Sequence, residues 1–271
     1  MKIAQISDVH IRKLKYHKEY RAVFEQLYES LRKEKPDIIV NTGDTFHTKL
    51  DLSPEAIRMM SELFENLSDI APYHMLLGNH DMNLKNNSRL DAITPIVEAL
   101  EHPNLCLLKA SGEVLVNDKF TLNVLSIFDE DNWVEPTDEE KINIALYHGS
   151  ISGVKTDLGW TMEYGDHNIS IFDKFDFAFL GDIHKTNQIL DLKGRIRYPG
   201  STIQQNHGET NNKGLLIWDI QDRYHWDVEH VSFVIRNHLL LLNLHQKEEY
   251  QIKQKFQTAP VFVWFQTTTF P

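Results

Sequence analysis

Aspartate, histidine and asparagine recur in five short polar groups, and each group follows an apolar run. The groups are S-D-V-H at 7–10, G-D-T-F-H at 43–47, G-N-H-D at 78–81, Y-H-G at 147–149 and G-D-I-H at 181–184. Carboxylates, imidazoles and amide oxygens are the groups by which proteins bind divalent metals. One such group is most simply a turn, because Gly, Asn and Asp are common there. Five of them, each after an apolar run, predict a shared metal site.

The chemistry of a phosphoryl centre accounts for these residue types. Two divalent cations about 3.5–4 Å apart can clamp the attacking and leaving oxygens of an in-line displacement at phosphorus. We expect Asp44 to bridge the two ions, which share a water that becomes the nucleophile. The amide oxygen of Asn79 is neutral, so it can bind one ion without reducing the Lewis acidity of that ion. His80 is expected to face the substrate as a general acid or as a stabiliser of the leaving oxygen.

Buried strands precede the first three groups, and amphipathic helices separate these strands. Residues 17–34 carry Val23, Leu27 and Leu31 at helical spacing, and 53–67 opens with Ser53 as a helix N-cap. A further helix is predicted over residues 89–100. This alternation predicts a parallel sheet, and ligands of such sheets bind outside the carboxyl ends of the strands.

From Leu105 onward, predicted strands follow one another without helices between them. A hairpin is expected to turn at Lys193–Gly194, and two strands, 214–220 and 224–233, complete the pattern. We therefore predict an α/β fold in which two sheets pack face to face with helices outside, one sheet largely parallel and the other mixed.

Composition and charge limit the functions that remain. The chain has 271 residues and a net charge of −11, which argues against non-specific binding of DNA through a basic surface. It does not exclude an enzyme that holds phosphates through metal ions. The single cysteine, Cys106, indicates a reducing compartment. Without a signal-peptide pattern or an apolar run long enough for a bilayer, a cytoplasmic protein with no membrane span is expected.

In their order, the five groups resemble the calcineurin-like metallophosphoesterase superfamily, whose pattern is D-x-H, G-D, G-N-H-D/E, H and G-H-x-H. The resemblance runs from Asp8 to His184 and implies a two-sheet αββα sandwich with a dinuclear centre of manganese, iron or zinc. It assigns two ligand sets that share Asp44: Asp8, His10, Asp44 and His184 for one ion, and Asp44, Asn79, His148 and Asp182 for the other.

Narrower features are similar to the SbcD-type nuclease subunits of double-strand-break repair complexes. In G-D-T-F-H, His47 takes the position of a histidine that helps to steer the DNA end. Residues 196–214 are similar to that branch's Y-P-G-S loop followed by a Glu and a Lys-Gly, which makes Tyr198 and Ser201 candidates for substrate binding. The resemblance implies a DNA exonuclease or endonuclease acting in repair, recombination or replication. It also implies two divalent ions, with Mn²⁺ expected, and an SMC-like ATPase partner; a homodimer is a further possibility, and the minimal form suggests a phage or prokaryotic origin.

Two departures from the superfamily pattern matter. Asp182 stands where the superfamily usually has His; because Asp is a competent ligand for hard metals, we expect it to replace the imidazole, and the alternative is a site for a single ion. The nuclease domain is predicted over residues 1–234. Residues 235–271 are too few for both a DNA-capping domain and an ATPase-binding segment, so we expect a truncated or reduced tail.

Two other functions stay open at this point. One is a small-molecule phosphoesterase, for example one acting on cyclic nucleotides, for which an acidic surface would be natural. The other is a non-catalytic scaffold with the same fold, which the intact polar groups weigh against.

Overall fold

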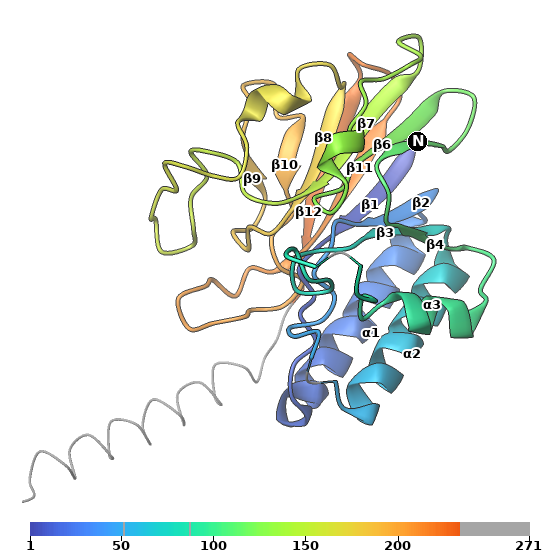
Figure 1. The fold of residues 1–271 in the computed structure, drawn as a ribbon, viewed down its shortest axis with the longest axis vertical. Coiled ribbons are helices and arrows are strands. Elements are labelled where there is room, and N and C mark those ends of the chain that lie inside the picture. Colours follow the sequence, from blue (N-terminus) through green and yellow to red (C-terminus); the bar gives the residue numbers. More distant parts are fainter. Residues whose placement is uncertain (51, 87, 234–271) are drawn as a thin grey trace, which may run out of the picture. The chain divides into compact units, whose positions relative to one another are not determined.

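Four parallel strands and an antiparallel pair form the first sheet, in the order β12-β11-β1-β2-β3-β4 (Figure 1). The computed structural model describes residues 1–50, 52–86 and 88–233, which belong to one unit, Met1–Val234. The parallel strands are β1 (Lys2–Ile6), β2 (Ile38–Asn41), β3 (Tyr73–Leu76) and β4 (Leu105–Leu108), and the antiparallel pair is β11 (Gly214–Ile220) and β12 (Trp226–Ser232). The predicted tail, 235–271, lies outside the described residues.

Three α-helices connect the parallel strands and lie together along this sheet: α1 (His17–Glu34), α2 (Pro54–Ile70) and α3 (Thr94–Leu100) (Figure 1). Ser53 caps α2 as predicted, since its hydroxyl accepts a hydrogen bond from the Ala56 amide at 3.2 Å. The helix predicted from residue 89 begins only at Thr94. The reason is that Asp91 accepts hydrogen bonds from the amides of Ile93 and Thr94, which holds the chain in a turn before the helix.

The second sheet has the order β5-β6-β7-β8-β10-β9. Its strands are β5 (Gly112–Leu115), β6 (Phe120–Leu125), β7 (Ile142–His148), β8 (Phe177–Gly181), β9 (Gln188–Ile189) and β10 (Ile196–Tyr198). The four central strands are parallel and the edge strands antiparallel, so both sheets are mixed, where the sequence predicted one largely parallel sheet. The predicted two-sheet sandwich is confirmed.

Alternation along the strands divides the apolar residues between two clusters. On β7, Ile144 and Leu146 point between the sheets, where they meet residues of the first sheet such as Val40 and Trp218. Tyr147 points to the outer face and packs with residues of the loops after β7 and of the 3-10 turn η3 (Ile169–Phe172). Loops and short turns, rather than α-helices, therefore cover this face in the described part of the chain.

Polar contacts join the two sheets where β1 and β2 end. The hydroxyl of Thr42 and the amide of Gln5 both donate to the carbonyl of Leu180 at the end of β8, at 2.9 and 3.3 Å. Thr202 donates to the carbonyl of Ser7 at 2.9 Å. The carboxyl ends of strands from both sheets are thereby held at one edge, where the five polar groups of the sequence lie. No helix among the described residues is long and apolar enough to cross a membrane.

Candidate metal centre

The loops after β1 and β2 run side by side beyond the sheet and carry the first two polar groups. The amides of Asp8 and His10 donate to the carbonyls of Gly43 and Asp44, both at 3.0 Å. The hydroxyl of Tyr20, on α1, donates to the carbonyl of His10. The first helix and the second loop therefore fix the main chain that carries Asp8 and His10.

Four of the candidate ligand residues have left-handed backbone conformations. The φ angles are 52° at Asp8, 48° at His10, 56° at Asp44 and 99° at Asp182. Asp and His adopt this region more readily than most residues, yet each case still costs of order 1–3 kcal/mol and is typical of functional sites. A glycine is required beside them, because a Cβ at Gly78 would lie 2.1 Å from the Asp44 carboxylate.

A compact group of candidate ligand atoms comes from Asp8, His10 and His184, with Asp44 beside His10. His10 Nε2 lies 3.6 Å from Asp8 Oδ1, 3.5 Å from Asp44 Oδ2 and 3.1 Å from His184 Nε2. His184 Nε2 lies 3.7 Å from Asp8 Oδ1. Two atoms that each bind one ion at about 2.1 Å, at angles of 90–109°, lie roughly 3.0–3.4 Å apart. The 3.1 Å separation lies in this range and the other three exceed it by 0.1–0.3 Å, so small inward movements of the side chains would let them share one metal ion.

The second predicted set is only partly brought together. His148 Nε2 lies 3.4 Å from Asp44 Oδ1, and the other ring nitrogen is hydrogen bonded to the carbonyl of Thr42 at 2.7 Å. Asp44 thus turns one oxygen toward His148 and the other toward His10. Among the described residues, no converging group of three ligand atoms includes Asp182, whose amide donates to Asp8 Oδ2 at 3.1 Å.

Several polar atoms at this edge are buried without a hydrogen-bond partner among the residues that the structure describes. They include Asp8 Oδ1, Asn79 Oδ1 and His148 Nε2. Leaving a buried polar atom unpaired costs about 1–3 kcal/mol, so such atoms need an explanation. Each is an acceptor of the kind that binds a divalent cation, and each comes from a residue that the sequence marks as a ligand. The residues therefore fit a metal centre.

Charges within the site shift several pKa values. Burial would raise the pKa of Asp8, but the neighbouring histidines, His10 first, hold it well below its usual range. Burial would lower the pKa of His148, yet the carboxylates of Asp44, Asp8 and Asp182 raise it well above its ordinary value. Burial, together with Asp8 and Asp44, raises the pKa of Asp182 to about 6. The carboxylates therefore require compensating positive charge, from protons or from metal ions.

The two predicted catalytic histidines lie beside the compact group. His80 Nδ1 is 2.6 Å from the carbonyl of His47, and its Nε2 is 4.0 Å from Asp44 Oδ2. The rings of His47 and His80 stack with centroids 5.7 Å apart. Burial and the nearby Arg12 lower the pKa of His47 to about 4, so this ring is neutral near pH 7.

Asp81, next to His80, has a structural role. Its carboxylate accepts hydrogen bonds from the amides of Thr45, Phe46 and Gly78 at 3.0 Å. It joins the turn after β2 to the turn after β3. In G-N-H-D, the turn interpretation therefore fits the last residue, Asp81, while His80 Nε2 lies near Asp44.

The prediction that Tyr198 and Ser201 bind substrate does not fit the structure. Both are 0% exposed. The Tyr198 hydroxyl donates to the carbonyl of Gly149 at 2.7 Å, and the Ser201 hydroxyl donates to Glu209 at 3.3 Å. Sequence reasoning missed Glu209 as a functional residue, although it contacts His184; the signal was the Glu that follows the Y-P-G-S loop.

Comparison with known proteins shows which family and which proteins the chain is similar to. A model of the calcineurin-like phosphoesterase family matches residues 1–186. Uncharacterized protein R555 of Acanthamoeba polyphaga mimivirus is 38% identical over 236 residues, and the match covers 82% of this chain and 17% of the viral protein. A component of the nuclease SbcCD from Staphylococcus epidermidis is 27% identical over 260 residues, and that match covers 82% of this chain and 67% of the bacterial protein.

A solved structure gives the same fold. The crystal structure of a dimetal phosphatase from Danio rerio aligns with a TM-score of 0.50 at 12% identity, covering 86% of this chain and 99% of the phosphatase. At this identity the likeness shows the fold alone.

Proposed function

The chain belongs to the calcineurin-like phosphoesterase family, and we propose that it is a metal-dependent phosphodiesterase that cleaves DNA through a dinuclear centre. The observation that carries the proposal is that Asp44 turns Oδ2 toward His10, which converges with Asp8 and His184, and Oδ1 toward His148. A carboxylate placed in this way suits a bridge between two ions.

We assign the ions as the sequence predicts, with Mn²⁺ as the expected metal. Asp8, His10, Asp44 and His184 would hold one ion, and Asp44, Asn79, His148 and Asp182 the other. Bound divalent ions supply Lewis acidity at the phosphoryl oxygens and a nucleophile derived from water.

The side chains around the ions have separate tasks in this proposal. His80 is held through Nδ1 by the carbonyl of His47, so Nε2 is the nitrogen left to exchange a proton with the leaving oxygen. His47 is neutral near pH 7 and stacks on His80, which suits a hydrogen bond to the substrate rather than a cationic contact.

Similarity to the SbcCD nuclease component and the G-D-T-F-H group support DNA as the substrate. With that substrate we propose an SMC-like ATPase as the partner and a part in DNA repair or recombination. The net charge of −11 favours a second candidate, a phosphoesterase for small diesters, because a negative surface repels a polyanion.

The test is a manganese-dependent cleavage assay on single-stranded and double-stranded DNA beside bis-p-nitrophenyl phosphate. Asp44→Asn is the control, because it keeps the shape of the side chain and removes the shared charge. We expect both DNA and the small diester to be cleaved, and cleavage to stop with a chelator or in the Asp44→Asn variant. Hydrolysis of the diester without any cleavage of DNA would favour the second candidate, and no hydrolysis of either would favour a scaffold.

A further inference from the structure

Glu209 lies in the segment between β10 and β11 and contacts a candidate metal ligand from behind. Its Oε1 is 2.8 Å from Nδ1 of His184. Asn206 donates to the same oxygen at 2.7 Å, and the amide of Gln205 donates to Oε2 at 2.9 Å. The carboxylate is buried and held from several sides, so its position against the imidazole is defined.

Lys213 completes this support. The side chain is 1% exposed, and a buried ammonium is stable only when paired. Its Nζ lies 3.1 Å from Glu209 Oε2 and 2.9 Å from Asp157 Oδ2, and it donates to the carbonyl of His184 at 2.7 Å. One lysine therefore fixes both the main chain of His184 and the carboxylate that touches its ring.

This contact decides which nitrogen of His184 can bind a metal. A carboxylate facing Nδ1 accepts its proton in a hydrogen bond and leaves the lone pair of Nε2 free. Nε2 is the atom that lies 3.1 Å from His10 Nε2 and 3.7 Å from Asp8 Oδ1. Within the described part of the chain, His184 is the one histidine of the candidate ligand sets with a carboxylate behind it, since His148 meets a carbonyl and His10 Nδ1 has no partner there.

We propose that Glu209 is a positioning residue that orients His184 and strengthens it as a metal ligand, and that Lys213 holds Glu209 in place. The inference rests on the proposed metal-dependent function. Carboxylates behind metal-binding histidines raise the basicity of the ring, and their loss typically weakens metal affinity about 10–100-fold.

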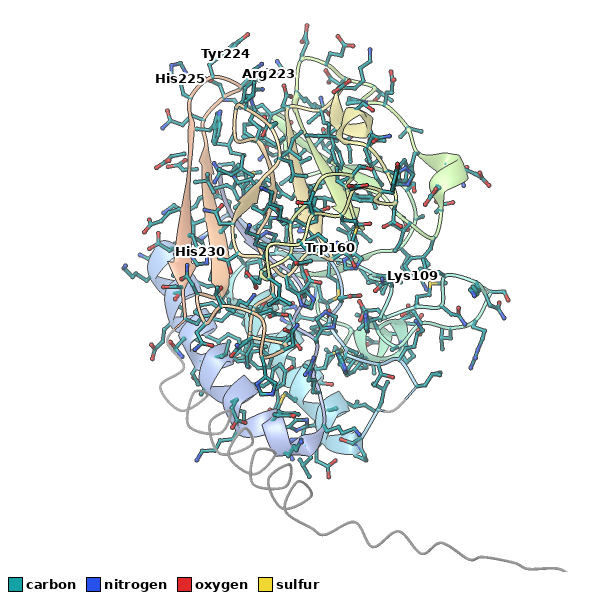
Figure 2. All side chains as sticks on the ribbon, turned by 90° about the vertical axis from the view of Figure 1, so that its left-hand side faces the viewer. Lys109, Trp160, Arg223, Tyr224, His225 and His230 are labelled. Atoms are coloured by element: carbon teal, nitrogen blue, oxygen red, sulfur yellow. The ribbon has the colours of Figure 1, made fainter. Side chains whose placement is uncertain are left out.

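The experiment measures manganese affinity of the full chain by calorimetric titration, without any activity assay. Glu209→Gln is expected to weaken the binding of one of two ions about tenfold, because the amide oxygen still accepts a bond but the charge is lost. Asp222→Asn is the matched control. It removes another carboxylate–imidazole contact, 2.8 Å to His225, at the tip of the β11–β12 hairpin (Figure 2).

A double-variant cycle separates positioning from a general structural effect. If Glu209 acts through His184, Glu209→Gln should change manganese affinity less than about twofold in a His184→Ala background. An undiminished effect in that background would overturn the inference. Equal affinity of wild type and Glu209→Gln would overturn it too, while leaving the proposed function intact. A wild-type chain that binds no manganese would instead remove the proposed function, and the inference with it.

A measurement on the wild-type chain answers the same question if Glu209→Gln does not fold. Nitrogen-15 spectra of the zinc-loaded protein, with labelled histidine, report which ring nitrogen carries the proton. We expect the His184 ring to carry the proton on Nδ1 and to bind zinc through Nε2. A His184 ring protonated on Nε2 would overturn the inference.

Discussion

The two sides of the candidate metal centre are built differently. On the side of His10 and His184, candidate ligand atoms lie 3.1–3.7 Å apart, and the pair Glu209–Lys213 supports one of them from behind. On the side of His148, ligand atoms of Asp8, Asp44 and His148 lie within 4.8 Å of one another, with His148 Nε2 3.4 Å from Asp44 Oδ1, and Asp182 joins no converging group among the described residues. The first side has a carboxylate behind one of its histidines, whereas on the second side the assigned ligand Asp182 lies outside the converging group. We therefore expect the first ion to bind more tightly.

His80 sharpens this comparison because it belongs to neither ligand set in our assignment. His80→Ala is expected to lower turnover about 10²–10⁴-fold, the range for a lost general acid, while manganese content stays at two ions per chain. Elemental analysis and steady-state kinetics measure the two quantities. His225→Ala, at the opposite end of the sandwich, is the control (Figure 2). Loss of metal together with turnover would mean that His80 is itself a ligand.

Asp182 is the residue that our assignment adds to the second side. Asp182→Ala is expected to weaken binding of the second manganese ion by at least about 10–100-fold and to leave the first ion bound. That range is the loss typical when a residue hydrogen-bonded to a metal ligand is removed, and loss of a ligand itself should cost no less. Asp182→His should keep activity and shift the preferred metal toward zinc or cobalt, because imidazole suits later metals than carboxylate does. If Asp182→Ala matches wild type in both metal content and rate, Asp182 is a turn residue.

His47 tests whether the centre acts on DNA. The ring of His47 stacks on His80, which is expected to face the substrate. His47→Ala should therefore reduce cleavage of duplex ends about tenfold more than hydrolysis of a small diester. Paired rate measurements on the two substrates give the ratio. Equal losses on both substrates would favour the small-diester function.

The smallest expected effect concerns pH and the metal-free protein. The pKa of His148 is raised in the fold, so the protonated ring stabilises the fold fully below about pH 6.5, its unfolded value, and less as pH rises through the raised pKa. Without metal, the melting temperature should therefore fall above about pH 6.5, by roughly 2–4 °C for each 1 kcal/mol lost. Manganese should restore it, since the ion replaces the proton.

Melting curves in chelator and in manganese measure this difference across the pH range. His148→Gln is the control, because it removes the titrating ring. A metal-free melting temperature that is flat or that rises above neutral pH would contradict the proposed charge balance.

Sequence alone predicted the sandwich and the edge at which the polar groups meet. The prediction worked because parallel strands place their carboxyl ends together, so that Asp8, Asp44 and His148 converge from strands far apart in the chain. Residue type could not separate ligands from supports. Asp81 has the same chemistry as Asp8, yet three backbone amides occupy its carboxylate.

Burial explains the other misses. Tyr198 ends β10 and Ser201 follows it, near where the ligands lie on other strands, but the hydrogen bonds they make lie inside the fold. The Glu and the Lys-Gly after the Y-P-G-S loop were part of the resemblance, but their spacing in the sequence did not show that Glu209 and Lys213 contact His184. Their contact with His184 arises from tertiary packing, which local sequence does not encode.

The most direct test of the dinuclear centre is an anomalous difference map from manganese-soaked crystals of the wild-type chain. Our account predicts two peaks about 3.5–4 Å apart on either side of Asp44, one within reach of His10 and His184 and the other within reach of Asn79, His148 and Asp182. The first peak should be the stronger at limiting manganese. A single peak beside His10 at saturating manganese, with nothing beside His148, would contradict the two-metal assignment.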